Sequence, residues 1–242
     1  MADAKEISAF KTTEWTDVLE ASGSNSLVAA AALEILCQKY WYPLYAFGRR
    51  RGHAPHDAED LTQAFFAHLL DKDMLKNVDR EKGRFRSFLL ASFTNFLNND
   101  WDKQRRLKRG GGKTIVSFDE MQAEERYQLE PADDASPEKL FERRWAWTVV
   151  EQVLAHLRQE YTAQAKADVF AKLEPFLTTE FTATSLSICA AELQMTENAL
   201  KVARHRLRRR FGENLRSEIA RTVATPEEVQ EEIRHLFAAI SL

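Results

Sequence analysis

The residues best suited to contact a nucleic acid lie between positions 185 and 211, where a short apolar helix, a tight turn and an arginine-rich helix are expected in succession. Ala190 is a small residue at the place where two such helices would touch. Neighbouring apolar residues can form a shared seam: Cys189, Leu193, Met195 and Leu200. This order indicates a helix-turn-helix, whose second helix enters the major groove of duplex DNA.

Thr196 is a good N-cap, so we expect the second helix to begin there. Its first turns would present three side chains to base edges: Glu197, Asn198 and Lys201. The arginines that follow are suited to phosphates: Arg204, Arg206, Arg208, Arg209 and Arg210. Gln194 lies in the turn where such units usually place glycine, and a non-glycine residue at positive φ costs about 1 kcal/mol. The alternative is a surface hairpin with solvated arginines.

Length and composition favour a folded protein of the cytoplasm. The chain has 242 residues, of which 44% are hydrophobic, enough for one large or two small domains. The longest apolar run, 27–36, is interrupted by Glu34 and is too short for membrane insertion, and the N-terminus lacks a signal-peptide profile. Cys37 and Cys189 fall within apolar helical patterns, so we expect buried thiols rather than a disulfide or a metal site.

Charge is segregated along the chain although its net value is only -3. Basic residues gather at 103–113 and 201–210, whereas acidic residues fill 119–142 and the part after Glu213. This distribution suggests two separate DNA contacts joined by an acidic connector.

The motifs of enzymes are missing from the sequence. Gly112-Lys113-Thr114 resembles a phosphate-binding loop, but that loop needs a glycine five residues before Gly112, where this chain has Leu107. The histidines never fall into a paired metal-ligand spacing, and no Gly-x-Ser-x-Gly turn occurs. We therefore expect no catalytic activity, no cofactor and no metal.

Helical periodicity dominates and predicts an all-α fold, with only 114–118 resembling a short strand. In the first half, helices are expected over 27–51, from Pro55 to Leu69 and over 84–106, with a polar loop at 71–83. They would form a three-helix domain.

In the second half, Ser136-Pro137 begins a helix, and an amphipathic patch follows between Phe170 and Leu177. Thr225 and Glu228 fit a capping box before an amphipathic end helix, which we expect to pack on its own domain, with docking onto a partner as the alternative. The domains expected are an N-terminal extension (1–26), a first helical domain (27–109), an acidic flexible linker (110–135), a second helical domain (136–216) and the C-terminal amphipathic helix (217–242).

Two stretches resemble the bacterial sigma factors that direct RNA polymerase to promoters. Residues 57–65 read Asp-Ala-Glu-Asp-Leu-Thr-Gln-Ala-Phe, and residues 85–90, Asn95, Asp100 and a basic cluster follow. Together they resemble domain two of the extracytoplasmic-function (ECF) group of the sigma-70 superfamily. Residues 202–210 resemble domain four of that group, which contains a helix-turn-helix.

The resemblance implies a role for each segment. Residues that would bind the core polymerase are Glu59, Asp60 and Gln63. Residues that would melt the promoter and hold its proximal element are Phe85, Arg86, Asn95, Trp101, Lys103, Arg105 and Arg106. Residues that would contact the distal promoter element are Thr196, Glu197, Asn198, Lys201, Val202, Arg204, Arg206 and Arg209. Promoter DNA and core polymerase are the implied partners, and the resemblance leaves room for an anti-sigma factor.

Two rival functions remain open from the sequence. A conventional helix-turn-helix regulator would use the same second helix on a palindromic operator, but it gives no role to the strip at 57–65. An RNA-binding or adaptor protein would use the basic patches on structured RNA, but no RNA-binding module is recognisable.

Overall fold

The computed structural model describes residues 26–69, 84–104, 120–128, 135–223 and 225–241. Every regular element in these residues is a helix, which confirms the all-α prediction for this part of the chain. The chain divides into two compact units: unit 1 holds residues 1–148 and 219–242, and unit 2 holds residues 149–218. No helix in the described ranges is long and apolar enough to cross a membrane. The stretch 114–118, which resembles a short strand in sequence, lies outside the described residues.

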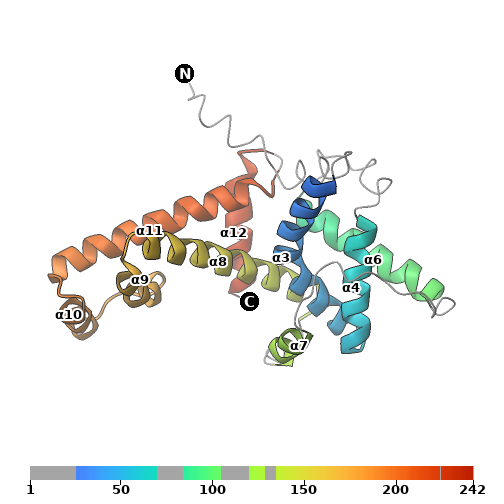
Figure 1. Ribbon diagram of the computed structural model, residues 1–242, viewed down its shortest axis with the longest axis horizontal. Helices are drawn as coiled ribbons and strands as arrows, with labels where there is room; N and C mark the ends of the chain where they lie inside the picture. The colour runs from blue at the N-terminus through green and yellow to red at the C-terminus, as the bar shows by residue number, and fades with distance from the viewer. Residues whose placement is uncertain (1–25, 70–83, 105–119, 129–134, 224, 242) are drawn as a thin grey trace, which may run out of the picture. The chain divides into compact units, whose positions relative to one another are not determined.

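Unit 1 is built on α3 (Ser26–Arg50), α4 (Pro55–Leu69) and α6 (Phe85–Gln104), the three helices expected from the periodicity (Figure 1). Aromatic rings fill its core. Phe65 contacts Phe93 with ring centroids 5.0 Å apart, and Phe93 in turn contacts Phe47 at 6.1 Å. These three rings are fully buried. Because burying an aromatic side chain removes 150–250 Å² from water, this cluster is a main source of stability for the bundle.

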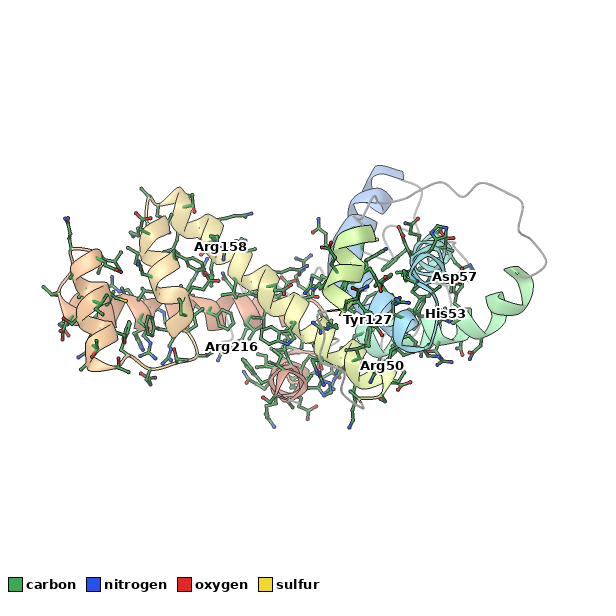
Figure 2. All side chains as sticks on the ribbon, turned by 90° about the horizontal axis from the view of Figure 1, so that it is seen from below. Arg50, His53, Asp57, Tyr127, Arg158 and Arg216 are labelled. Carbon is green, nitrogen blue, oxygen red and sulfur yellow. The ribbon has the colours of Figure 1, made fainter. Side chains whose placement is uncertain are left out.

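The turn between α3 and α4 is determined by local sequence. Gly52 has φ +91°, a left-handed conformation that glycine adopts without steric cost. The backbone N–H of His53 donates to the carbonyl of Gly48, and that of Gly52 to the carbonyl of Arg49, the pattern of a Schellman helix end. Pro55 then takes the first position of α4. His53 in the turn and Asp57 in the first turn of α4 lie near one another (Figure 2). The predicted helix end and restart are confirmed.

A short helix, α7 (Glu120–Gln128), forms within the stretch that the sequence predicts as a flexible linker. Its Glu124 carboxylate accepts hydrogen bonds from Tyr45 at 2.6 Å and from Arg49 at 2.8 and 2.9 Å, which fastens α7 to α3. Arg126 lies over the ring of Tyr42, 4.3 Å from its centroid. The prediction of a flexible linker is therefore wrong for 120–128. The helix escapes a search for apolar periodicity because polar contacts hold it.

Unit 2 combines the second part of α8 (Pro137–Ala163) with α9 (Ala167–Leu173), the short 3-10 helix η2 (Glu174–Phe176), α10 (Ala183–Glu192) and most of α11 (Glu197–Ala220). As predicted, α8 begins at an N-cap: the Ser136 hydroxyl accepts from the N–H of Lys139 at 3.3 Å. The apolar core of unit 2 draws on each of its four α-helices: Leu157, Phe170, Leu173, Leu186, Leu200 and Leu207.

Both cysteines are free and buried, as the sequence predicts. Burial raises the pKa of the Cys37 thiol from 9.0 to about 12. A thiol with so high a pKa carries almost no thiolate at neutral pH, so Cys37 acts as a small apolar core residue.

The helix-turn-helix connection between α10 and α11 is closed by backbone hydrogen bonds. Met195 N–H donates to the carbonyl of Ala190 at 2.9 Å, and Gln194 N–H to that of Ala191 at 3.2 Å. These two bonds make a Schellman end, and Gln194 has the left-handed φ of 52° that it requires. The Thr196 hydroxyl then accepts from the N–H of Ala199 at 3.2 Å and caps α11.

Replacing Gln194 with glycine should raise the free energy of unfolding of the protein by about 1 kcal/mol, because the left-handed conformation is strained for glutamine and not for glycine. Chemical denaturation measures the change as a higher midpoint at constant slope. Ser187→Gly is the control: Ser187 is exposed in the middle of α10, where glycine should lower the free energy of unfolding by about 0.5 kcal/mol instead. Equal destabilisation by both substitutions would contradict a strained turn.

The last helix, α12 (Glu228–Ile240), belongs to unit 1 and not to the unit that contains the helix-turn-helix. It buries Val229, Leu236 and Ala239. The expectation that this helix packs on the domain preceding it in sequence is therefore wrong. Of the predicted capping box, one bond is present: the N–H of Thr225 donates to the Glu228 carboxylate at 3.2 Å.

Candidate nucleic-acid and polymerase interface

One face of α11 is exposed along its first three turns. Residues three or four positions apart share a face of a helix, and the exposed residues of α11 follow this spacing. They are Glu197, Asn198, Lys201, Val202, His205, Arg206 and Arg209. The opposite face buries Leu200 and Leu207 against the core of unit 2. Thr196 is also exposed, at the start of the helix. The structure thus brings together on one surface all but one of the residues predicted for the distal element.

Arg204 is the exception, because it lies on the buried face and is only 9% exposed. Its Nε donates to the carbonyl of Phe176 at 2.8 Å and its Nη2 to that of Thr179 at 2.6 Å, while Nη1 contacts Glu180 at 2.5 Å. Each of the three guanidinium nitrogens thus has a partner within unit 2. The sequence-based expectation that its head reaches solvent or a phosphate is wrong, and Arg204 instead joins α11 to the segment before α10.

Two further arginines of the basic run also have partners within unit 2. Arg208 contacts the carbonyl of Leu177 at 2.8 Å and Glu180 at 3.0 Å, and Arg210 is bidentate on Glu160 at 2.7 and 3.0 Å. Hydrogen bonds from Arg204 and Arg208 lower the pKa of Glu180 from 4.5 to about 2, so it stays ionised at neutral pH. The run is therefore divided between arginines that hold unit 2 together and cations that face outward.

The cations that face outward on α11 are Lys201, Arg206 and Arg209, and in the described part of the chain carboxylates of unit 2 do not hold them as they hold Arg208 and Arg210. Arg209 makes an exposed contact with Glu213, one turn further along α11, at 3.3 Å. Among the described residues, no ion pair involves Lys201 or Arg206. Since such pairs at a surface contribute little, these three cations can bind an anionic partner without breaking a stabilising contact.

The strip on α4 predicted to bind polymerase is only partly exposed. The Asp60 side chain is 61% exposed and lies 3.7 Å from His56. Gln63 is half-buried and donates to Glu59 at 2.9 Å. Glu59 itself is only 6% exposed, so the prediction that it faces outward is wrong. It lies on the side of α4 that turns toward the bundle, so Asp60 is the exposed carboxylate of the predicted set, with Asp57 also exposed in the first turn of α4.

The residues predicted for promoter melting separate into several groups. Phe85 is completely buried and packs edge-on against Tyr40 at 5.5 Å, so it is a core residue and cannot stack on an unpaired base. Asn95 is exposed on α6. Trp101 and Lys103 lie in the last turns of α6, but their side chains are outside the described part of the structure. Arg105 and Arg106 lie outside it altogether.

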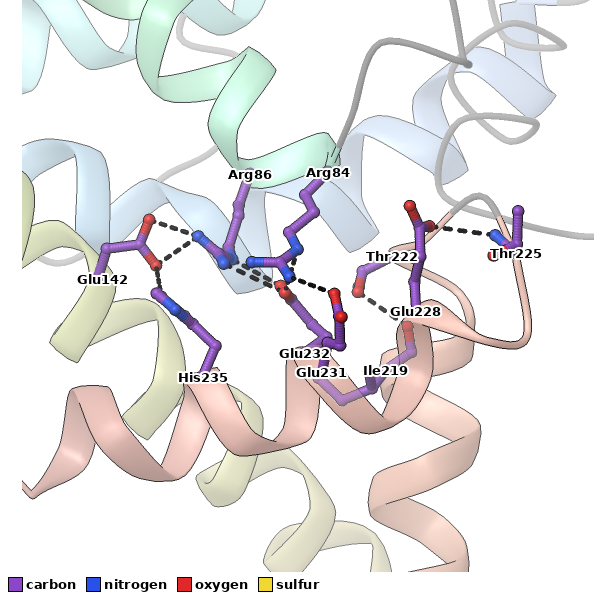
Figure 3. A network of polar contacts seen from close by, with 10 residues as sticks. All are labelled: Arg84, Arg86, Glu142, Ile219, Thr222, Thr225, Glu228, Glu231, Glu232 and His235. Atoms are coloured by element: carbon purple, nitrogen blue, oxygen red, sulfur yellow. Dashed lines mark hydrogen bonds and ion pairs between the residues drawn. The ribbon is translucent and has the colours of Figure 1, made fainter.

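Arg86 belongs to a buried network of ion pairs and is 3% exposed (Figure 3). Its guanidinium contacts Glu232 of α12 at 2.6 and 3.1 Å, contacts Glu142 of α8, and lies 4.7 Å from the ring centroid of Trp145. Arg84 adds a contact with Glu232 at 2.8 Å. Sequence reasoning missed the two carboxylates, which lie 56 and 146 residues further along the chain.

Comparison with known families identifies the helices that carry this site. Residues 36–107 match the family model of sigma-70 region 2. These residues are thus similar to that region of the sigma-70 family. The match spans α4, α6 and most of α3. Comparison with curated proteins and with solved structures finds no match.

Sigma-70 region 2 supports a sigma-factor-like role in binding RNA polymerase and melting a promoter, and it supports a place for the chain in the sigma-70 family. Factors of this family start transcription without catalysing a reaction themselves. Within region 2, the exposed residues available to partners include Asp60 on α4 and Asn95 on α6. The helix-turn-helix lies outside the matched residues.

Proposed function

We propose that this protein is a sigma factor of the ECF type, which binds core RNA polymerase through region 2 and recognises promoter DNA through both of its units. The observation that carries this proposal is the presence, in one chain, of a region 2 and of a helix-turn-helix whose α11 turns an uncovered cationic face to solvent. Neither feature alone requires a sigma factor. A regulator of the operator-binding kind needs only α11.

The chemistry of the exposed α11 face suits duplex DNA. The side-chain amide of Asn198 can accept from adenine N6 through its oxygen and donate to adenine N7 through its nitrogen. Lys201 can donate to guanine, and Glu197 can accept from the amino group of cytosine. Arg206 and Arg209 are further along the helix and can contact phosphates, which position a recognition helix without reading sequence. In this proposal, α11 lies in the major groove at the distal promoter element.

Region 2 contributes the polymerase contact and the opening of the duplex. The exposed carboxylate of Asp60 provides negative charge for a basic surface of the polymerase, which is the proposed docking contact on α4. Asn95 is exposed on α6, and the same helix continues toward Trp101 and Lys103. An aromatic ring beside cations can stack on an unpaired base while the cations hold phosphates, so the end of α6 is the proposed melting element.

Reversing the charge at Asp60 should abolish association with the polymerase while the fold is retained. The Asp60→Arg variant places a positive charge against a basic surface, and a like-charge contact costs several kcal/mol, which weakens binding at least about 100-fold. Co-purification of the full chain with core polymerase measures the effect. Asp168→Arg on α9 is the matched control, because it makes the same charge change at an exposed position outside region 2. Retention of core by Asp60→Arg at the control level would refute the docking contact.

A further inference from the structure

The C-terminal helix α12 covers the arginines at the beginning of α6. Glu232 contacts both Arg84 and Arg86, and Glu231 lies 3.5 Å from Arg84 (Figure 3). Both helices belong to unit 1, and α6 starts inside the matched region 2. The positive charges at the start of this helix are thus neutralised by a segment that lies outside the region 2 match.

Ion pairs lie at the centre of the contact between α12 and the start of α6. The Glu232 side chain is 1% exposed, while that of Glu231 is 65% exposed. Two arginines with planar guanidinium groups are well suited to bind phosphate, and they bind carboxylates in the same geometry. The carboxylates of α12 therefore occupy positions at which the arginines could otherwise hold a phosphate backbone.

A contact held by ion pairs can separate at a lower cost in free energy than an apolar contact of equal area. Removing two ions from water carries a desolvation penalty of several kcal/mol per ion, and that penalty is recovered when α12 separates from α6. Besides its pairs with Arg84 and Arg86, α12 contacts Glu142 of α8 through His235 at 2.9 Å, and it buries Val229, Leu236 and Ala239. Separation of α12 from α6 would leave Arg86 in contact with Glu142 and Trp145, so the start of α6 keeps part of its support.

We propose that α12 is an internal competitor for nucleic acid, which masks Arg84 and Arg86 until the phosphates of single-stranded DNA displace its glutamates. Single-stranded DNA is the expected occupant because the arginines belong to region 2, the part assigned to promoter melting, and in this respect the inference rests on the proposed function. In the free protein the masked state predominates and DNA binding by region 2 is weak. Binding of DNA and docking of α12 exclude one another at this site.

The first experiment compares the affinity of the full chain for a fluorescent single-stranded oligonucleotide, by anisotropy and without polymerase. Glu231→Gln with Glu232→Gln removes the competing charges. The control, Glu125→Gln with Glu227→Gln, removes the same net charge from exposed positions of unit 1 that do not contact the arginines. If α12 is docked in about nine-tenths of the molecules, the first variant binds about tenfold more tightly than the control. Equal affinities, or no binding by any form, would overturn the proposal.

A second measurement protects the test against a variant that misfolds. Amide hydrogen exchange of the unmodified chain should show that saturating oligonucleotide removes protection from α12 and leaves α4 unchanged. Full protection of α12 in the DNA-bound protein contradicts the proposal. Both assays omit the polymerase. If both assays give the expected results but the protein never supports transcription initiation, the sigma function alone is refuted. If the protein supports initiation but neither assay gives the expected result, the masking alone is refuted.

Discussion

Replacing Arg204 with methionine is expected to lower the free energy of unfolding of the protein by about 3 kcal/mol. Methionine keeps much of the length of the side chain but offers no donor to Phe176, Thr179 and Glu180. Each hydrogen bond to a charged group contributes about 1.5–3 kcal/mol, and a carbonyl left buried without a donor adds its desolvation cost. Arg208 still donates to the Thr179 carbonyl, which limits the loss.

Arg206→Met provides the matched control for this substitution. Arg206 is exposed on the same helix, so its replacement should change stability by no more than about 0.5 kcal/mol. Urea denaturation of the two variants and the parent protein supplies the comparison. Equal and small effects would show that Arg204 points to solvent, as its position in a basic run had suggested.

Replacing both Lys201 and Arg206 with alanine is expected to weaken DNA binding strongly while the fold stays intact. Each cation that contacts a phosphate contributes about 1 to the slope of log K against log salt, so the slope should fall by about 2 if both bind phosphate. A base contact made by Lys201 instead would appear as relaxed sequence preference at one position, with a loss of about 1–3 kcal/mol. Holoenzyme binding to a promoter fragment over a range of salt concentrations distinguishes these outcomes.

A control for total charge is needed because every lost cation weakens binding to a polyanion. Lys166→Ala with Lys172→Ala removes two exposed cations of unit 2 that lie outside α11. This pair should change the salt slope by much less than the α11 pair. If the two double variants behave alike, α11 is not the helix that contacts promoter DNA.

Local sequence predicted the three helices of region 2, the start of α8 and the start of α11. Gly52 at positive φ, Pro55 at a first helical position and Thr196 as an N-cap each act within one turn of the chain, so neighbouring residues suffice to infer them. The exposed face of α11 followed from helical spacing in the same way. The strained conformation of Gln194 was also visible in the sequence, because glycine is missing where the turn requires a left-handed residue.

The errors concern residues whose surroundings come from distant parts of the chain. Arg86 is buried because Glu232, 146 residues later, neutralises it, and Arg204 is buried because the segment around Glu180 folds over it. A basic residue in a charged run is normally solvated, and only the fold shows which carboxylates approach it. α7 was missed for a related reason: Glu124 holds it on Tyr45 and Arg49, and no apolar stripe marks it.

In vitro transcription with purified core polymerase tests the central claim most directly. The full chain, mixed with core enzyme and a library of genomic fragments, should start transcripts at defined positions, and Asp60→Arg should suppress them while Asp168→Arg does not. The same chain without core should bind duplex DNA weakly. Absence of any defined start, combined with tight binding to a palindromic site by the chain alone, would contradict a sigma factor and identify an operator-binding regulator.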